Sequence, residues 1–173
     1  EDDLTPEGSY HWTYWKYEQK RNLIAKGIMA TAEQLGSFPS IIAVAEAENR
    51  QVLDDLLRNT ALAKRHYSLL HKESPDPRGM DVAMIYDAQK VTLLKHEFIE
   101  IPDFATRDIL YASVILKDSD APVCDTIHLF VNHWPSKRSS DKSDKRRFAV
   151  ARTLVQHIDA IRLNFGKNAK ILL

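Results

Sequence analysis

Apolar positions recur with helical spacing in three segments of the chain, which are separated by shorter runs rich in β-formers. Helices are predicted over Tyr14–Leu35, from the N-cap candidate Asn49 onward, and from about Ser143 to Phe165. The predicted buried stripes are, in chain order, Tyr17, Ile24, Ile28 and Leu35; Val52, Leu53, Leu56 and Leu57; and Phe148, Ala151, Val155, Ile158, Ile161 and Phe165. A glycine, which commonly ends a helix, directly follows the first and the third segment.

The runs between the helices are predicted to be strands because β-branched and aromatic residues are enriched in them. They are Ser40–Ala45, Tyr67–Leu70, Asp81–Tyr86, Val91–Ile99, Ile109–Leu116, Thr126–Asn132 and Lys170–Leu173. The block of successive strands after the second helix favours antiparallel pairing. The long third helix before the last strand favours a crossover that covers one face of a sheet. The predicted fold class is therefore α/β, with mixed sheets arranged in layers.

Composition narrows the class of protein. The chain has 173 residues, 44% of them hydrophobic, which suits a single domain over residues 1–173. Lys+Arg and Asp+Glu each number 24, so the zero net charge argues against a globally basic nucleic-acid binder. No apolar run approaches the roughly 20 residues of a membrane span. The single cysteine, Cys124, excludes an intrachain disulfide and disfavours a thiolate zinc site.

Several polar residues stand where the predicted strands begin or end. Glu46 closes the apolar run Ile41–Ala45, which is typical of a buried strand. An ionised carboxylate at such a depth needs a metal, a cation or several donors, although a neighbour of a helix cap or a salt-bridge partner would look the same. His133 follows the strand that ends at Asn132, and an imidazole there suits acid–base work or donation to a phosphoryl oxygen. A hydrogen-bonded loop histidine is the plain alternative.

Three further features complete the set of candidates. Asp81 opens a strand and is suited to orienting a histidine, or it is simply a turn residue. Arg107 heads another strand, where a guanidinium can bind a phosphate or form a surface ion pair. The basic segment Lys137–Arg147 can neutralise phosphates or be a solvated loop. Together these residues are the inventory of metal-assisted phosphoester hydrolysis.

The combined pattern resembles the endonuclease/exonuclease/phosphatase superfamily, which has the DNase-I-like fold. The resemblance is carried by Ala43–Asn49, Arg78–Ala83 and Val131–Ser136, with Arg147 and Ala151 on the next helix. The Asn-His-Trp-Pro-Ser run at 132–136 is most similar to a bacterial endonuclease-like branch. The resemblance spans nearly the whole chain and implies a four-layer α/β-sandwich with mixed, largely antiparallel sheets.

The resemblance also implies an activity: hydrolysis of phosphate esters by a nuclease, phosphodiesterase or phosphatase that uses Mg²⁺, or Mn²⁺ in its place. Glu46 matches the family's metal-binding glutamate. His133 matches the histidine that acts on the phosphate or the leaving group, and Asp81 falls near the carboxylate that orients this histidine. Arg107 resembles a phosphate-contacting arginine, and Arg147 in the basic segment is a second candidate for that role.

Some of the family's pattern is not found in the chain. Its first strand with an asparagine, its Gly-Asp-x-Asn motif and its Ser-Asp-His motif have no counterpart, so we expect a fragment cut at both ends with little activity of its own. The alternative is a non-catalytic module that binds a partner or polyanion through Lys137–Arg147. The substrate stays open between nucleic acid, a phospholipid head group and a small phosphate ester. Localisation and oligomeric state are open too.

Overall fold

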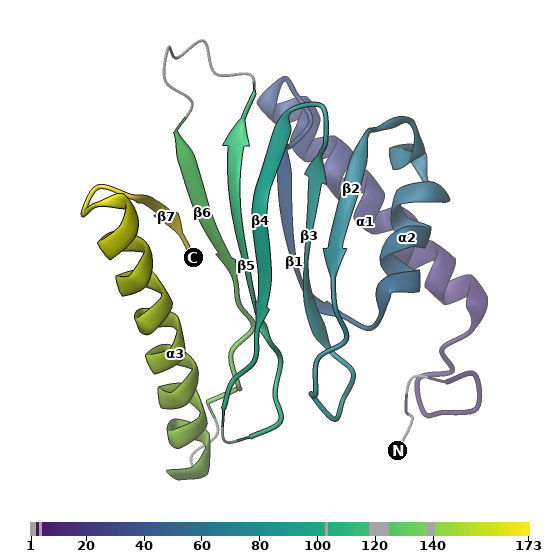
Figure 1. Ribbon diagram of the computed structural model, residues 1–173. Coiled ribbons are helices and arrows are strands. Elements are labelled where there is room, and N and C mark those ends of the chain that lie inside the picture. Colours follow the sequence, from purple (N-terminus) through teal and green to yellow (C-terminus); the bar gives the residue numbers. More distant parts are fainter. Residues whose placement is uncertain (1–2, 4, 103, 118–124, 138–140) are drawn as a thin grey trace. The chain divides into compact units, whose positions relative to one another are not determined.

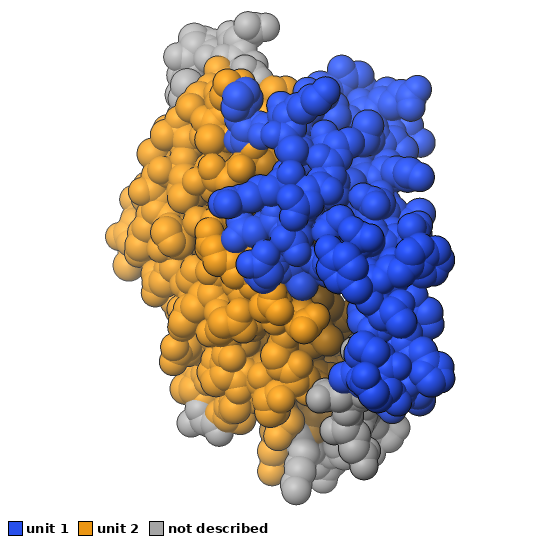
Figure 2. Space-filling view, turned by 90° about the vertical axis from the view of Figure 1, so that its right-hand side faces the viewer, with its two compact units in different colours: residues 1–39, 51–66 blue, residues 40–50, 67–173 orange. Residues whose placement is uncertain are grey.

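The computed structural model describes the chain except for residues 1–2, 4, 103, 118–124 and 138–140. Cys124 and part of the basic segment Lys137–Arg147 therefore lie outside the described residues. The described chain divides into two compact units (Figure 2). Unit 1 comprises residues 1–39 and 51–66, and unit 2 comprises residues 40–50 and 67–173.

Unit 1 is helical. It contains α1 (Tyr14–Leu35), most of α2 (Arg50–Arg58) and a short 3₁₀ helix, η1 (Ala61–Lys64). The Thr13 hydroxyl accepts a hydrogen bond from the first turn of α1, and Gly36 ends the helix at φ 70°, a left-handed conformation that favours glycine. The Tyr17 hydroxyl donates to Asp55 at 2.7 Å. Burial, reinforced by this carboxylate, raises the pKa of Tyr17 to about 12.

The buried stripe of α1 differs from the predicted one. Arg21, Ala25 and Ala32 are buried, whereas Ile24 and Leu35 are exposed. The helix thus buries a face of small and polar residues, which lies next to the apolar face that the sequence predicted to be buried. In α2 the prediction is confirmed, because the leucines of its stripe are buried.

Unit 2 contains two sheets and one long helix. The first sheet has the order β1-β3-β2 and is antiparallel throughout. The second has the order β4-β5-β6-β7, in which only the β6–β7 pairing is parallel. The elements are β1 (Ile41–Ala47), β2 (Tyr67–His71), β3 (Asp81–Asp87), β4 (Val91–Ile99), β5 (Ile109–Leu116), β6 (Thr126–Val131), α3 (Asp141–Phe165) and β7 (Lys170–Leu172). The predicted crossover between the last two strands is confirmed, with α3 as its helix.

Two apolar cores hold unit 2 together. Met84 of β3 packs with Leu110 and Val114 of β5 in the core between the two sheets. On the other face of the second sheet, Phe130 packs against α3 residues such as Leu154. The helix lies along this outer face (Figure 1). Because β5 is covered on both faces, its first six residues are all buried.

Two predictions about burial are wrong in unit 2. The strand that ends at Glu46 is not deeply buried, because β1 is an edge strand of the described sheet and pairs with β3 alone. The stripe of α3 is wrong in part. Phe148 and Val155 are exposed, and Val150 and Leu154 face the core in their place, whereas Ile158 and Ile161 pack against the core as predicted. This helix carries apolar side chains on more than one face, so spacing does not decide which face packs.

No helix of the described chain is long and apolar enough to cross a membrane.

A buried histidine links the fold to pH. The His128 side chain lies in the second sheet, where its Nδ1 is 2.8 Å from the Tyr111 hydroxyl, and burial lowers its pKa. The unfolded chain binds a proton at His128 more readily than the folded chain does. The contribution of neutral His128 to the free energy of unfolding should therefore be complete above about pH 6.5 and be lost as the pH falls toward the lowered pKa of the folded state. We expect urea denaturation to show lower stability at pH 5 than at pH 7.5, with a smaller difference in His128→Gln. The exposed histidine variant His96→Gln should keep the full difference, and an unchanged difference in His128→Gln would contradict the prediction.

Candidate active site

The strand ends that carry the candidate residues meet at one edge of unit 2. In the first sheet, Ala47 at the end of β1 pairs with Asp81 at the start of β3. An ion pair between Glu46 and His133 connects this edge to the end of β6 in the second sheet. Of the candidates at this edge, Glu46 and His133 have solvent-exposed side chains, 68% and 28% respectively, so a ligand can reach these two.

Glu46 occupies an unusual position in β1. The pairing with β3 shifts register between Ala45 and Ala47, so Glu46 is the extra residue of a β-bulge. Its φ is 60°, in the left-handed region that a glutamate seldom adopts. Its side chain is 68% exposed. Bulges and strained residues of this kind are concentrated at functional sites, because they aim a side chain away from the sheet.

His133 contacts this glutamate. Its Nε2 lies 3.4 Å from Glu46 Oε1, and its side chain is 28% exposed, so it stays within reach of a ligand. The preceding Asn132 donates to the carbonyl of Phe130 at 3.1 Å, while its buried Oδ1 has no hydrogen-bond partner in the structure. The sequence predicted Glu46 and His133 as candidates, but not the contact between them.

Asp81 is fully buried and is held by a different histidine from the one expected. Its Oδ1 accepts from the backbone N–H of Ser74 at 3.0 Å and from the Ser74 hydroxyl. Its Oδ2 lies 3.6 Å from Nε2 of His71. Among the described contacts, none joins Asp81 to His133. An orienting action of Asp81 on His133 therefore stays a prediction.

The two candidate arginines make contacts of their own. Arg107 is only 3% exposed, and its Nε lies 3.5 Å from Asp76 Oδ2. Arg147 donates to the carbonyl of Pro135 at 2.9 Å, and its guanidinium lies over the ring of Trp134 in a cation–π contact. Both therefore support the loops that flank the site. Phosphate binding by either one stays a prediction.

A charged group at the same edge was not predicted. Lys72 donates to Glu100 at 2.8 Å and to the buried Asp108 at 3.1 Å, and these bonds raise its pKa. Burial raises the pKa of Asp108, the Lys72 bond opposes this, and the charges of Glu100 and Asp81 add to the increase. Carboxylates are thus concentrated at this edge, which favours cations there.

The comparisons with known proteins identify the family. The model of the Endonuclease/Exonuclease/phosphatase family matches residues 1–173. The chain belongs to this family. A comparison with curated proteins gives no significant match.

Several solved structures share the fold of this chain. They include the human Nocturnin catalytic domain with bound sulfate (17% identity, TM-score 0.60, 84% of this chain and 52% of that chain). A Bacteroides thetaiotaomicron mannosyl-6-phosphatase has 15% identity and a TM-score of 0.55, covering 90% and 55%. D. rerio TDP2 complexed with a single-strand DNA product has 16% identity and a TM-score of 0.52, and the match covers 76% of this chain and 47% of that chain. These likenesses show the fold, and the chain spans about half the length of each neighbour.

Family and fold class are therefore confirmed, with two sheets and mostly antiparallel strands as in the DNase-I-like neighbours. Sequence reasoning missed His71 and Glu73, which lie beside Asp81. The available signal was their spacing. They follow the predicted strand Tyr67–Leu70 at alternate positions, so a continued strand would place both side chains on one face.

Proposed function

We propose that the protein to which this chain belongs is a phosphoester hydrolase that depends on a divalent metal ion, with Glu46 as a metal ligand and His133 as the residue that acts on the phosphate or the leaving group. The observation that carries the proposal is the exposed Glu46 carboxylate, held out of its strand by a bulge and 3.4 Å from His133. Membership of the family supports hydrolysis of phosphate esters as the reaction class.

The chemistry of Glu46 fits Mg²⁺, and also Mn²⁺. Mg²⁺ prefers oxygen ligands and is commonly held by one or two carboxylates together with waters and substrate phosphates. Glu46 Oε1 faces His133, and no hydrogen bond or ion pair of the described residues engages its Oε2. A divalent ion bound there would supply positive charge for the phosphate oxygens.

His133 supplies the second part of the proposed chemistry. Its imidazole is partly exposed beside the Glu46 carboxylate, and this contact orients the ring. From this position it can hydrogen-bond to a phosphoryl oxygen or donate a proton to the leaving oxygen. In this proposal Asp81 is a positioning residue, because its contacts with Ser74 and His71 fix the start of β3 beside Ala47.

The substrate class is a phosphate ester, either nucleic acid or a smaller ester. One neighbour is described with a DNA product and another as a sugar phosphatase. The zero net charge gives no preference for long duplex DNA. The candidate arginines would have to exchange their contacts with Asp76 and Pro135 to reach a substrate.

The proposal is tested with this chain and the complete protein, each incubated with bis-p-nitrophenyl phosphate and p-nitrophenyl phosphate. We expect the complete protein to release nitrophenolate with Mg²⁺ or Mn²⁺ and to stop on addition of EDTA. The ratio of the two rates would separate diesterase from monoesterase. Failure to hydrolyse either ester would overturn the proposal. Salt-sensitive polyanion binding that persists in EDTA would then favour a binding module.

A further inference from the structure

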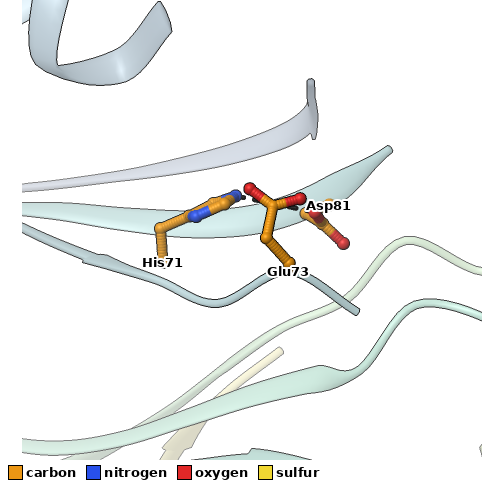
Figure 3. Close-up of side chains that lie close together, drawn as sticks. All are labelled: His71, Glu73 and Asp81. Carbon is orange, nitrogen blue, oxygen red and sulfur yellow. Dashed lines mark ion pairs between the residues drawn. The ribbon is translucent and has the colours of Figure 1, made fainter. Parts of the chain in front are cut away.

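Three potential metal ligands converge where β2 runs into β3. The side chains of His71, Glu73 and Asp81 each offer one donor atom, and these atoms lie within 4.8 Å of one another. Figure 3 shows the Glu73 carboxylate extending toward the imidazole of His71 and the carboxylate of Asp81. None of the three belongs to the proposed Glu46–His133 pair. Within the described part of the chain, no other group of three or more His, Cys, Asp or Glu side chains brings its donor atoms close enough together to hold one metal ion.

Two of the donor atoms are buried without a hydrogen bond. His71 Nε2 and Asp81 Oδ2 belong to side chains that are 2% and 1% exposed, and neither atom has a hydrogen-bond partner, although the two form an ion pair with each other. Buried polar atoms almost always have a partner, so this pair needs an explanation. The atoms are 3.6 Å apart, which is too long for a hydrogen bond. Two ligands of a tetrahedral Zn²⁺ stand about 3.4 Å apart when the metal–ligand bonds are about 2.1 Å.

The surroundings hold these donors in place. Both Ser74 bonds go to Asp81 Oδ1, which leaves Oδ2 directed at His71. Outer contacts of this kind orient the ligands of metal sites. The nearby Lys72 is occupied by Glu100 and Asp108, and no described ion pair joins it to Asp81. Glu73 is exposed, so an ion can enter from solvent on its side.

We propose that His71, Glu73 and Asp81 bind a divalent transition-metal ion, with Zn²⁺ preferred. One imidazole and two carboxylates are a zinc-type ligand set, whereas Mg²⁺ and Ca²⁺ prefer oxygen alone. The bound ion would link the end of β2 to the start of β3 and so hold together the two ends of the loop between these strands. This loop contains Asp76, the ion-pair partner of Arg107. This site shares the positioning residue Asp81 with the proposed catalytic one, but it does not depend on Glu46 or His133.

The test uses this chain, freed of metal and titrated with Co²⁺ as a spectroscopic substitute and with Zn²⁺ against a chromophoric chelator. We expect one equivalent of Co²⁺ to produce visible ligand-field bands, Zn²⁺ to displace it, and Zn²⁺ to raise the melting temperature. Removing a ligand should cost at least as much as the 10–100-fold typical of an outer contact. His71→Gln should therefore lower the affinity for Zn²⁺ by about 100-fold or more, and Glu73→Gln by about 10-fold or more.

Glu97→Gln, at an exposed carboxylate on β4, is the matched control and should bind Zn²⁺ as the unmodified chain does. Glu73→Gln alters an exposed side chain, so it keeps the test decisive if His71→Gln does not fold. Absence of the Co²⁺ bands, or equal Zn²⁺ affinity in Glu73→Gln and the unmodified chain, would overturn the proposal. Because the readouts are spectra and affinity, they are separate from the hydrolysis assay: either proposal can fail while the other stands.

Discussion

Replacing Glu46 by glutamine is expected to lower the Mg²⁺-dependent hydrolysis of bis-p-nitrophenyl phosphate at least about 100-fold in the complete protein. Glutamine keeps the shape of the side chain and removes the charge, so it weakens both the hold on a metal ion and the contact with His133, now 3.4 Å away. Measurement of kcat/KM over a range of Mg²⁺ concentrations should show a lower maximum and a higher Mg²⁺ requirement. An unchanged Mg²⁺ requirement with full activity would show that Glu46 is not the ligand.

Two control variants separate this loss from misfolding. Glu48→Gln removes an exposed carboxylate two residues away and should leave the rate unchanged. Glu46→Gly should abolish hydrolysis and yet be at least as resistant to urea as the unmodified protein. The reason is the φ of 60° at this position, which glycine adopts without steric cost and glutamate does not. Loss of stability in Glu46→Gly would contradict the interpretation that strain here is retained for function.

Replacing His133 by glutamine is expected to lower hydrolysis by about 10²–10⁴-fold, the usual contribution of a positioned acid or base. Its Nε2 is the atom that faces Glu46, and Gln retains hydrogen-bonding capacity but cannot take up or release a proton as an imidazole does. The measurement is kcat for the complete protein at saturating Mg²⁺. His66→Gln, at an exposed histidine, is the control and should retain activity.

The leaving group distinguishes two roles for His133. Nitrophenolate departs readily, whereas the phenolate of diphenyl phosphate depends more on protonation. If His133 protonates the leaving oxygen, His133→Gln should lose more activity toward diphenyl phosphate than toward the nitrophenyl diester. An equal loss with both esters would assign His133 to the phosphoryl oxygens instead. No loss with either would remove it from the site.

The local elements of the fold were predictable because they depend on neighbouring residues. Thr13 and Gly36 delimit α1 through a hydroxyl cap and a left-handed turn, both of which need only a few adjacent residues. The strands were predicted in order, and the long third helix correctly indicated the parallel β6–β7 crossover. Antiparallel pairing within the block of strands after the second helix followed from their succession in the chain, whereas the pairing of β1 with β3 was not predicted.

The buried faces of the helices were less predictable. Hydropathy assigned Phe148 and Val155 of α3 to the core, but Val150 and Leu154 pack against the second sheet. Several faces of this helix are apolar, and only the position of the sheet selects one of them. The depth of β1 was overestimated for a related reason: a run of apolar residues does not reveal how many strands will pair beside it.

The sequence by itself determined the family, the fold class, and Glu46 and His133 as candidates, because strand ends and short motifs are written in adjacent residues. Tertiary structure decided which side chains meet. It brought Glu46 of one sheet into contact with His133 beyond the other. It also placed Asp81 against His71 and Ser74, and it buried Arg107 beside Asp76. Such contacts depend on strand register and on a single bulge. A shift of one residue turns a side chain to the opposite face, and local spacing does not encode that shift.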